Sequence, residues 1–150
     1  SGRKWEIMYF GSFVHNLDEK GRLMIPRKMR EELGYKVYIM KGFDGSLSLY
    51  NEERYLELVK EFSRLSFNQQ KVRDYLRIQF ASTYEMEVDK LGRVQLPTAL
   101  LNKYNISKEV IVLGIGDHIE VWDKAKYIEY EESVKDSFES IAEDIDAKRD

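Results

Sequence analysis

The sequence predicts an α+β protein built from two pseudo-symmetric halves, each with the order β-β-α-β-β-α. The main observation is an internal repeat, in which DEKGR at residues 18–22 returns 71 residues later as DKLGR at residues 89–93. The chain has two prolines, Pro26 and Pro97, and each follows its motif at the same spacing. Repetition of this kind indicates a duplicated structural unit.

The elements of the two halves are expected in matching order. Before the first long helix we expect elements at residues 11–17, 23–25, 29–33, 37–40 and 47–50. Their counterparts in the second half fall at residues 84–88, 94–96, 100–104, 110–113 and 119–122. Residues 47–50 and 119–122 alternate apolar and polar side chains, as half-buried strands do. Each short helix is entered through a proline, whose fixed φ suits a first helical turn.

Longer helices follow the last strand of each half. Asn51 and Asp123 stand at N-cap positions, where a short polar side chain accepts a backbone N–H. Apolar residues at helical spacing predict a helix over residues 51–65, and a second helix capped by Asn68 is expected to end near residue 82. The apolar stripe of the C-terminal helix is looser, which is compatible with ordinary packing or with docking on a neighbouring subunit.

Length and composition indicate a soluble globular protein. The 150 residues, 43% hydrophobic and 34% charged, suit one compact domain or two small halves sharing a core. We expect a first repeat with two helices at residues 8–82 and a second repeat with an acidic C-terminal helix at residues 83–150. Residues 1–7 are either an extension foreign to the fold or the beginning of the first strand.

Several classes of function are disfavoured. Without cysteine there is no disulfide or thiolate chemistry, and the isolated His15 and His118 do not make a metal site. No apolar run reaches the roughly 18 residues of a membrane span, and no signal peptide precedes the first strand, so we expect a cytoplasmic protein. No nucleophile, phosphate-loop or metalloprotease motif is present. We therefore predict no enzyme activity, no metal, no cofactor, no small-molecule substrate and no membrane partner.

Charge is distributed unevenly along the chain. The net charge is −3, but residues 18–41 carry seven Lys or Arg against four acids, a balance of +3. Residues 117–150 carry five against twelve, a balance of −7. The basic segment is suited to an anionic partner such as nucleic acid. The acidic C-terminal segment either repels that partner and so directs it to the basic face, or is simply a well-solvated helix.

The repeated motif has two chemical interpretations. The Asp carboxylate accepts backbone N–H groups within a tight turn, and the Gly tolerates a positive φ. The Arg then either pairs with the Asp and staples the hairpin, or projects toward a phosphate or a guanine. Lys20 and Lys90, in the same turns, would add phosphate contacts that raise affinity without reading sequence.

With two D-x-x-x-R turns, each followed by an apolar stretch, a proline and a short helix, the chain resembles the MraZ family of bacterial transcription regulators. That family is built on the AbrB-like swapped-hairpin fold. The resemblance spans residues 8–143 and implies a shared β-barrel-like core with outer helices. It also implies a ring of subunits whose turns face DNA. The target it implies is direct repeats in the promoter of the division and cell-wall gene cluster.

Matched to the family motif, the site consists of two groups of residues. The DNA-binding residues are expected to be Arg22, Arg93, Lys20, Lys90, Arg27 and Lys28. The residues that support the turns are expected to be Asp18, Gly21, Asp89 and Gly92. Because Arg27, Lys28 and Arg30 follow the first motif, we expect the first turn to have the stronger basic flank.

Together with the resemblance, these observations predict a sequence-specific DNA-binding regulator of transcription. The resemblance further implies that it is nucleoid-associated and binds tandem promoter repeats as a ring-shaped homo-oligomer. The alternative is a protein-interaction scaffold that uses the acidic C-terminal helix and does not bind DNA. RNA is disfavoured because no aromatic platform for single strands is evident.

Overall fold

The two halves of the chain fold into the same series of elements. The computed structural model describes residues 9–148, and the expectation for residues 1–7 lies outside this range. The first half contains β1 (Ser12–Asn16), β2 (Arg22–Met24), α1 (Arg27–Leu33), β3 (Lys36–Lys41), β4 (Leu47–Asn51), α2 (Glu52–Ser63) and α3 (Gln70–Ala81). The second half contains β5 (Tyr84–Glu87), β6 (Arg93–Gln95), α4 (Thr98–Lys103), β7 (Glu109–Gly114), β8 (Ile119–Asp123), α5 (Lys124–Val134), the 3₁₀ turn η2 (Lys135–Ser137) and α6 (Phe138–Ala147).

The strands of the two halves are interleaved. Six strands form one antiparallel sheet in the order β1-β7-β8-β4-β3-β5, so each edge strand pairs with a strand of the opposite half. Val14 on β1 stands opposite Ile111, and Met86 on β5 stands opposite Val37. The strands β2 and β6 form a separate antiparallel ribbon, with Leu23 opposite Val94. This exchange is the swapped-hairpin arrangement, and it confirms the predicted α+β fold with pseudo-symmetric halves.

The larger of two hydrophobic clusters lies between the sheet and the ribbon, and the smaller one gathers Ile111, Leu113 and Trp122. Leu23 and Val94 on the ribbon are completely buried, as are Leu49 on β4 and Val121 on β8. The short helices α1 and α4 close the ends of the core with Met29, Leu33 and Leu100. Because both halves contribute to one core, neither has a complete hydrophobic interior of its own.

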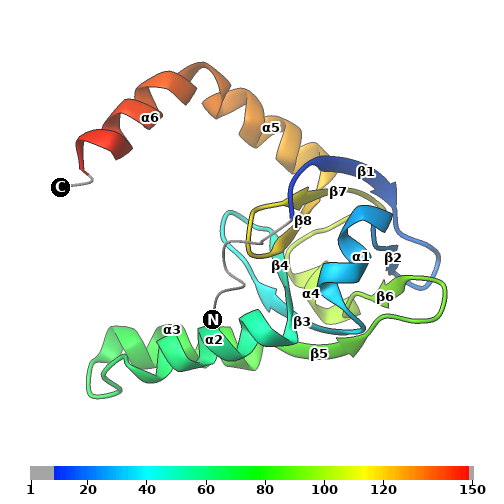
Figure 1. Cartoon of the computed structure of the whole chain (residues 1–150), viewed down its shortest axis with the longest axis horizontal. Helices are drawn as coiled ribbons and strands as arrows, with labels where there is room; N and C mark the ends of the chain where they lie inside the picture. Colours follow the sequence, from blue (N-terminus) through cyan, green and yellow to red (C-terminus); the bar gives the residue numbers. More distant parts are fainter. Residues whose placement is uncertain (1–8, 149–150) are drawn as a thin grey trace.

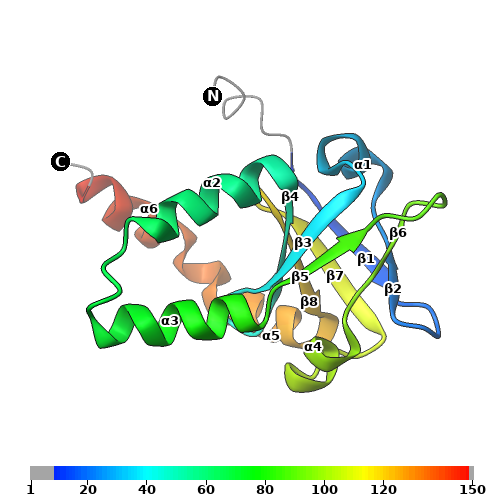
Figure 2. The same cartoon turned by 90° about the horizontal axis from the view of Figure 1, so that it is seen from below.

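Two helical arms leave this body (Figures 1 and 2). The first arm is the hairpin of α2 and α3. Its N-cap is as predicted, since the Asn51 side chain accepts a hydrogen bond from the N–H of Arg54 at 2.8 Å. The predicted Asn68 cap is wrong, because α3 begins at Gln70 and its N-cap is Gln69. The N–H of Gln69 instead donates to the Ser66 carbonyl at 3.1 Å, which places Asn68 inside the connecting turn.

The second arm is the C-terminal segment, and it is broken where the sequence predicts one helix. The Asp123 side chain caps α5 as expected by accepting from the N–H of Lys126. Residues Lys135–Ser137 then form the 3₁₀ turn before α6 begins at Phe138. Asp136 and Ser137 are weak helix formers because their side chains compete for backbone groups. No helix within residues 9–148 is long and apolar enough to cross a membrane.

Candidate nucleic-acid interface

The first repeated turn is built around one carboxylate. Oδ1 of Asp18 accepts the backbone N–H of Lys20 at 3.0 Å and that of Arg22 at 2.9 Å. Its Oδ2 accepts Nε–H of Arg22 at 2.6 Å. Gly21 has φ +79°, a value that L side chains rarely adopt. The backbone hydrogen bond from Arg22, helped by its side chain and by Lys20, holds the pKa of Asp18 below its usual range.

The second turn repeats this geometry closely. Oδ1 of Asp89 accepts the N–H groups of Leu91 and Arg93, both at 2.9 Å, and Oδ2 accepts Nε–H of Arg93 at 2.8 Å. Gly92 has φ +86°. The pKa of Asp89 is lowered, mainly by the backbone hydrogen bond from Arg93. In both turns the arginine therefore donates to the aspartate carboxylate through its Nε–H. The N–H groups on its two Nη atoms remain as donors for another acceptor.

The ribbon brings the two turns into one cluster. Leu23 and Val94 point into the core, so their neighbours on β2 and β6 lie on the outward face. Arg22 stands opposite Gln95, and Met24 stands opposite Arg93. Nη1 of Arg93 also lies 4.0 Å from Oδ2 of Asp18, so the carboxylate of the first turn contacts arginines from both halves.

Each turn is completed by the opposite half of the chain. The N–H of Ile25, next to α1, donates to the Gly92 carbonyl at 2.9 Å. The N–H of Leu96, next to α4, donates to the Gly21 carbonyl at 3.1 Å. Figure 2 accordingly shows α1 on the side of the β5–β6 turn and α4 on the side of the β1–β2 turn.

This exchange corrects the expected basic flank. Arg27 and Lys28 open α1, so they accompany the second turn in space although they follow the first in sequence. The side chain of Arg30 lies against Gly92 itself. Residues that follow a turn in the chain are therefore not its neighbours in the site, because the swapped hairpins bring the short helix of one half to the turn of the other.

The remaining predicted basic residues lie on the surface of the molecule. Lys20 and Lys90 are exposed at the tips of their turns, and Arg27 and Lys28 are exposed on α1. The ammonium of Lys28 stands 4.9 Å from the centre of the Phe10 ring. Gln95 is the functional candidate that the sequence argument missed. The signal available was its place one residue after the buried Val94, which puts its side chain on the same outward face as Arg93.

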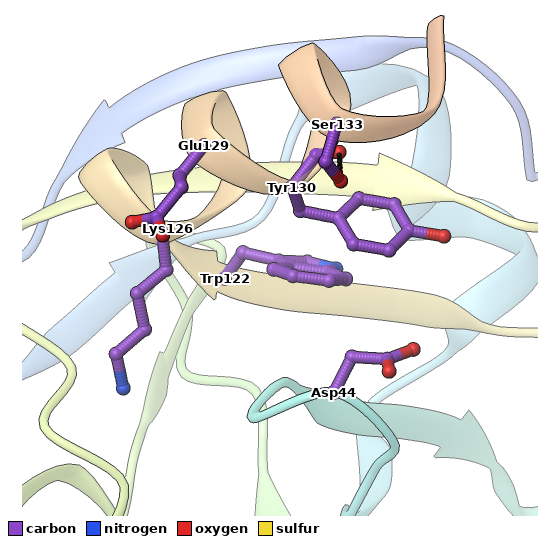
Figure 3. Close-up of a pocket in the computed structure, with 6 residues that line it drawn as sticks. All are labelled: Asp44, Trp122, Lys126, Glu129, Tyr130 and Ser133. Carbon is purple, nitrogen blue, oxygen red and sulfur yellow. Dashed lines mark hydrogen bonds between the residues drawn. The ribbon is translucent and has the colours of Figure 1, made fainter.

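A hollow lies beneath α5, away from the two turns (Figure 3). Tyr130 lies over Trp122 with ring centroids 5.0 Å apart, and Asp44 approaches from the β3–β4 turn. The Ser133 hydroxyl donates to the Tyr130 carbonyl, and the Lys126 ammonium donates to the carbonyl of Tyr104. The Trp122–Tyr130 ring contact and the Lys126–Tyr104 hydrogen bond attach α5 to the body, whereas the Ser133–Tyr130 hydrogen bond lies within α5. Within residues 9–148 no group of His, Cys, Asp or Glu is arranged to hold a metal ion.

The interleaved strands and the two Asp-stapled arginine turns define a duplicated AbrB-like swapped-hairpin protein. Comparison with known proteins agrees. The family model described as "MraZ protein, putative antitoxin-like" matches the chain twice, at residues 8–78 and 79–148. The chain belongs to the MraZ family.

Its relatives carry a common name. The chain is 42% identical over 140 residues to the transcriptional regulator MraZ of Mesoplasma florum, covering 93% of this chain and 96% of the relative. It is 38% identical over 138 residues to that of Syntrophomonas wolfei, covering 92% and 96%. For Mycoplasmoides gallisepticum the identity is 37% over 139 residues, covering 93% and 98%. The chain is accordingly a regulator of transcription.

Proposed function

We propose that the chain regulates transcription by binding double-stranded DNA in a sequence-specific manner through the outward face of the β2–β6 ribbon. The observation that carries the proposal is the pair of arginines, Arg22 and Arg93, held on that face by Asp18 and Asp89. Arginine donates two hydrogen bonds to the O6 and N7 atoms of guanine, and a fixed guanidinium loses less entropy on binding.

The charge distribution supports this orientation. Lys20 and Lys90 are exposed in the two turns, Arg27 and Lys28 are exposed at the start of α1, and all four would contact phosphates. The acidic helix α6 lies on the side of the body that is opposite to the two turns (Figures 1 and 2). A net charge of −3 therefore does not oppose DNA binding, because the strongly acidic C-terminal arm lies away from the proposed contact face.

The resemblance to the family extends the proposal to assembly. A ring-shaped homo-oligomer would bind tandem direct repeats ahead of the division and cell-wall gene cluster, in the nucleoid. The C-terminal arm offers a surface for such assembly, since Phe138 is 76% exposed and Ile145 is 63% exposed on α6. Several modest contacts matched to repeated sites give avidity that no single subunit has. The solution mass measured alone and with a promoter fragment tests this; a monomer in both conditions would contradict it.

The DNA contact is tested by Arg22→Ala and Lys20→Ala in anisotropy titrations with specific and random duplexes. Arg22→Ala should weaken specific binding by roughly 1–3 kcal/mol and leave random binding nearly unchanged. Lys20→Ala should weaken both and reduce the salt dependence. Lys60→Ala, exposed on the first arm, is the control. Unchanged specific affinity of folded Arg22→Ala protein would mean that the arginine only staples the turn.

A scaffold function is the second candidate, favoured by one specific observation. Between α5 and α6 lies an apolar groove lined by Tyr130, Val134, Phe138, Ile141 and Ile145. A scaffold that uses this groove predicts no salt-dependent DNA binding and loss of partner capture when the residues after Tyr127 are removed. Salt-dependent binding to duplex DNA that survives this truncation would reject the scaffold alternative.

A further inference from the structure

The side chain of Gln95 joins the second half of the chain to the turn of the first half. Its Nε2 donates to the Lys20 carbonyl at 2.6 Å and to its neighbour Leu96 at 3.0 Å. Both acceptors are carbonyl oxygens, so the amide nitrogen must face them, and both of its N–H groups are used. Lys20 stands two residues before Arg22, inside the turn that the Asp18 carboxylate organises.

Arg30 joins the first half to the turn of the second half. Its Nε donates to the Ile25 carbonyl at 2.8 Å, and Nη2 lies 3.1 Å from the sulfur of Met24. A Cβ on Gly92 would stand 2.6 Å from the guanidinium carbon of Arg30, so the guanidinium covers this glycine closely. The carbonyl of the same glycine accepts the N–H of Ile25. Arg30 thus fills the space directly above the second turn.

We propose that Gln95 and Arg30 are positioning residues, each holding the DNA-contacting turn of the opposite half in its binding geometry. The inference rests on the proposed function and names residues outside the repeated motif. The carboxylate staples act within each turn, whereas these two side chains fix each turn to the rest of the molecule. Specificity at Arg22 therefore depends on a residue more than 70 positions away in the sequence.

The two positioning residues differ in chemistry, which predicts different consequences. Gln95 is neutral, so its loss should release the first turn without changing long-range attraction for DNA. Arg30 is charged, so its loss should weaken binding to all duplexes and release the second turn as well. A turn freed from its support must be ordered again when DNA binds, and that ordering reduces affinity.

Gln95→Met tests the first contact, because methionine has a similar length and is the residue at the equivalent place in the other half, Met24. We expect specific affinity to fall about three- to tenfold, as for loss of one or two hydrogen bonds, while random-duplex affinity stays constant. Amide hydrogen exchange at residues 18–22 should accelerate and exchange at residues 89–93 should not. Asn102→Ala, exposed on the adjacent α4, is the matched control.

A double-mutant cycle separates positioning from general loss of stability. Gln95→Met should have little further effect once Arg22→Ala is present, but should act additively with Arg93→Ala. Additivity with both arginines, or unchanged exchange at residues 18–22 together with unchanged specificity, would overturn the role of Gln95.

Arg30→Lys and Arg30→Met test the second contact. Lysine keeps the charge but cannot reproduce the held guanidinium. We expect both variants to accelerate exchange at residues 89–93, and Arg30→Lys to recover only the random-duplex affinity. Full recovery of specific affinity by Arg30→Lys would overturn positioning in favour of a simple charge effect. If the unaltered protein bound no DNA, the proposed function would fail, and hydrogen exchange alone would still decide whether the two side chains hold the turns.

Discussion

At the scale of single residues, the two turn glycines have the same backbone conformation but different neighbours. A Cβ on Gly21 would lie 3.3 Å from Cδ1 of Leu101, a contact that small shifts relieve. At Gly92 the nearest atom would be the Arg30 guanidinium at 2.6 Å, which is held by its own hydrogen bonds. Gly45, in the turn between β3 and β4, also has a positive φ, +84°, but faces open space.

Alanine substitutions at these glycines should therefore differ in cost. Gly45→Ala should lower the free energy of unfolding by about 1–2 kcal/mol, the usual cost of a left-handed conformation. Gly21→Ala should cost slightly more, and Gly92→Ala should cost the most because it also displaces Arg30. Urea denaturation measures all three. Equal losses for Gly92→Ala and Gly45→Ala would show that Arg30 moves away freely.

His118 is a structural histidine whose charge is fixed by its neighbours. Its Nδ1 lies 2.7 Å from Oδ1 of Asp117, its Nε2 lies 3.9 Å from Glu120, and its ring stacks on Tyr50 at 4.7 Å. Burial alone would lower the pKa of His118, but the hydrogen bond to Asp117 and the nearby Glu120 carboxylate outweigh it and raise the pKa to about 9. Asp117, bonded to His118 and also to Arg54, has its pKa lowered to about 2.

This arrangement predicts a pH-dependent stability. A raised folded-state pKa means that the His118 contribution is complete below the unfolded value of 6.5 and is lost as the pH rises toward 9. The Asp117 contribution is complete above 3.8 and is lost as the pH falls toward 2. His118→Gln should flatten the decline in unfolding free energy between pH 6.5 and 9. His15→Gln is the control, since burial lowers the pKa of His15 and so keeps it neutral in that range.

At the scale of elements, both arms begin at a side-chain cap that also reaches a distant segment. The Asn51 amide accepts from Arg54 and donates to the Glu32 carbonyl at 3.0 Å, which ties α2 to the end of α1. Asp123 has a larger role, because its carboxylate also accepts the N–H of Ser107 at 2.8 Å and its hydroxyl at 2.6 Å. The caps thus set both the beginning of each arm and its attachment to the body.

Removing the caps should destabilise the two arms unequally. Asn51→Ala should lower the free energy of unfolding by about 1 kcal/mol, a typical value for an N-cap. Asp123→Ala should cost more, since Asp123 is buried and its carboxylate also accepts two hydrogen bonds from Ser107, which the substitution removes. Thermal unfolding followed by circular dichroism measures both. Gln69→Ala, at a cap position without a side-chain hydrogen bond, should have little effect.

At the scale of the whole molecule, the edges of the sheet explain why two halves make one folding unit. Among residues 9–148, β1 is paired with β7 and β5 is paired with β3 at the two edges of the sheet, so each edge strand is held by the other half. Arg54 on α2 reinforces this exchange with an ion pair to Asp117 of the second half, Nε to Oδ2 at 2.6 Å. Separating the halves would expose both the core and the unpaired strand edges.

Fragments of residues 9–82 and 83–148 should therefore lack a folded monomeric state. Each should show little ordered β-structure as a monomer, and mixing them should restore the spectrum and near-ultraviolet signal of the full chain. Circular dichroism with a parallel measurement of mass tests this expectation. A fragment that is folded and monomeric would contradict a shared core.

The sequence predicted the local features of the fold well and the long-range ones poorly. The turns, the proline entries to α1 and α4 and the caps at Asn51 and Asp123 depend on residues within about four positions, so their chemistry is legible in the chain. The choice of β7 as the partner of β1 depends on contacts nearly 100 residues apart. For the same reason the sequence argument assigned the basic flank to the wrong turn and did not identify Gln95. The break at Lys135–Ser137 was missed because a sparse apolar stripe fits one helix or two.

The crossing of the two halves also constrains how the family can recombine. A chimera of two relatives joined at the middle of the chain would combine the turn of one parent with the supporting side chain of the other, because Gln95 serves residues 18–22 and Arg30 serves residues 89–93. Exchanging each turn together with the opposite short helix and its preceding strand would keep every such pair intact. Substitutions in a turn should accordingly be correlated with substitutions at the supporting side chain of the opposite half. Correlation between residues of the same half should be weaker.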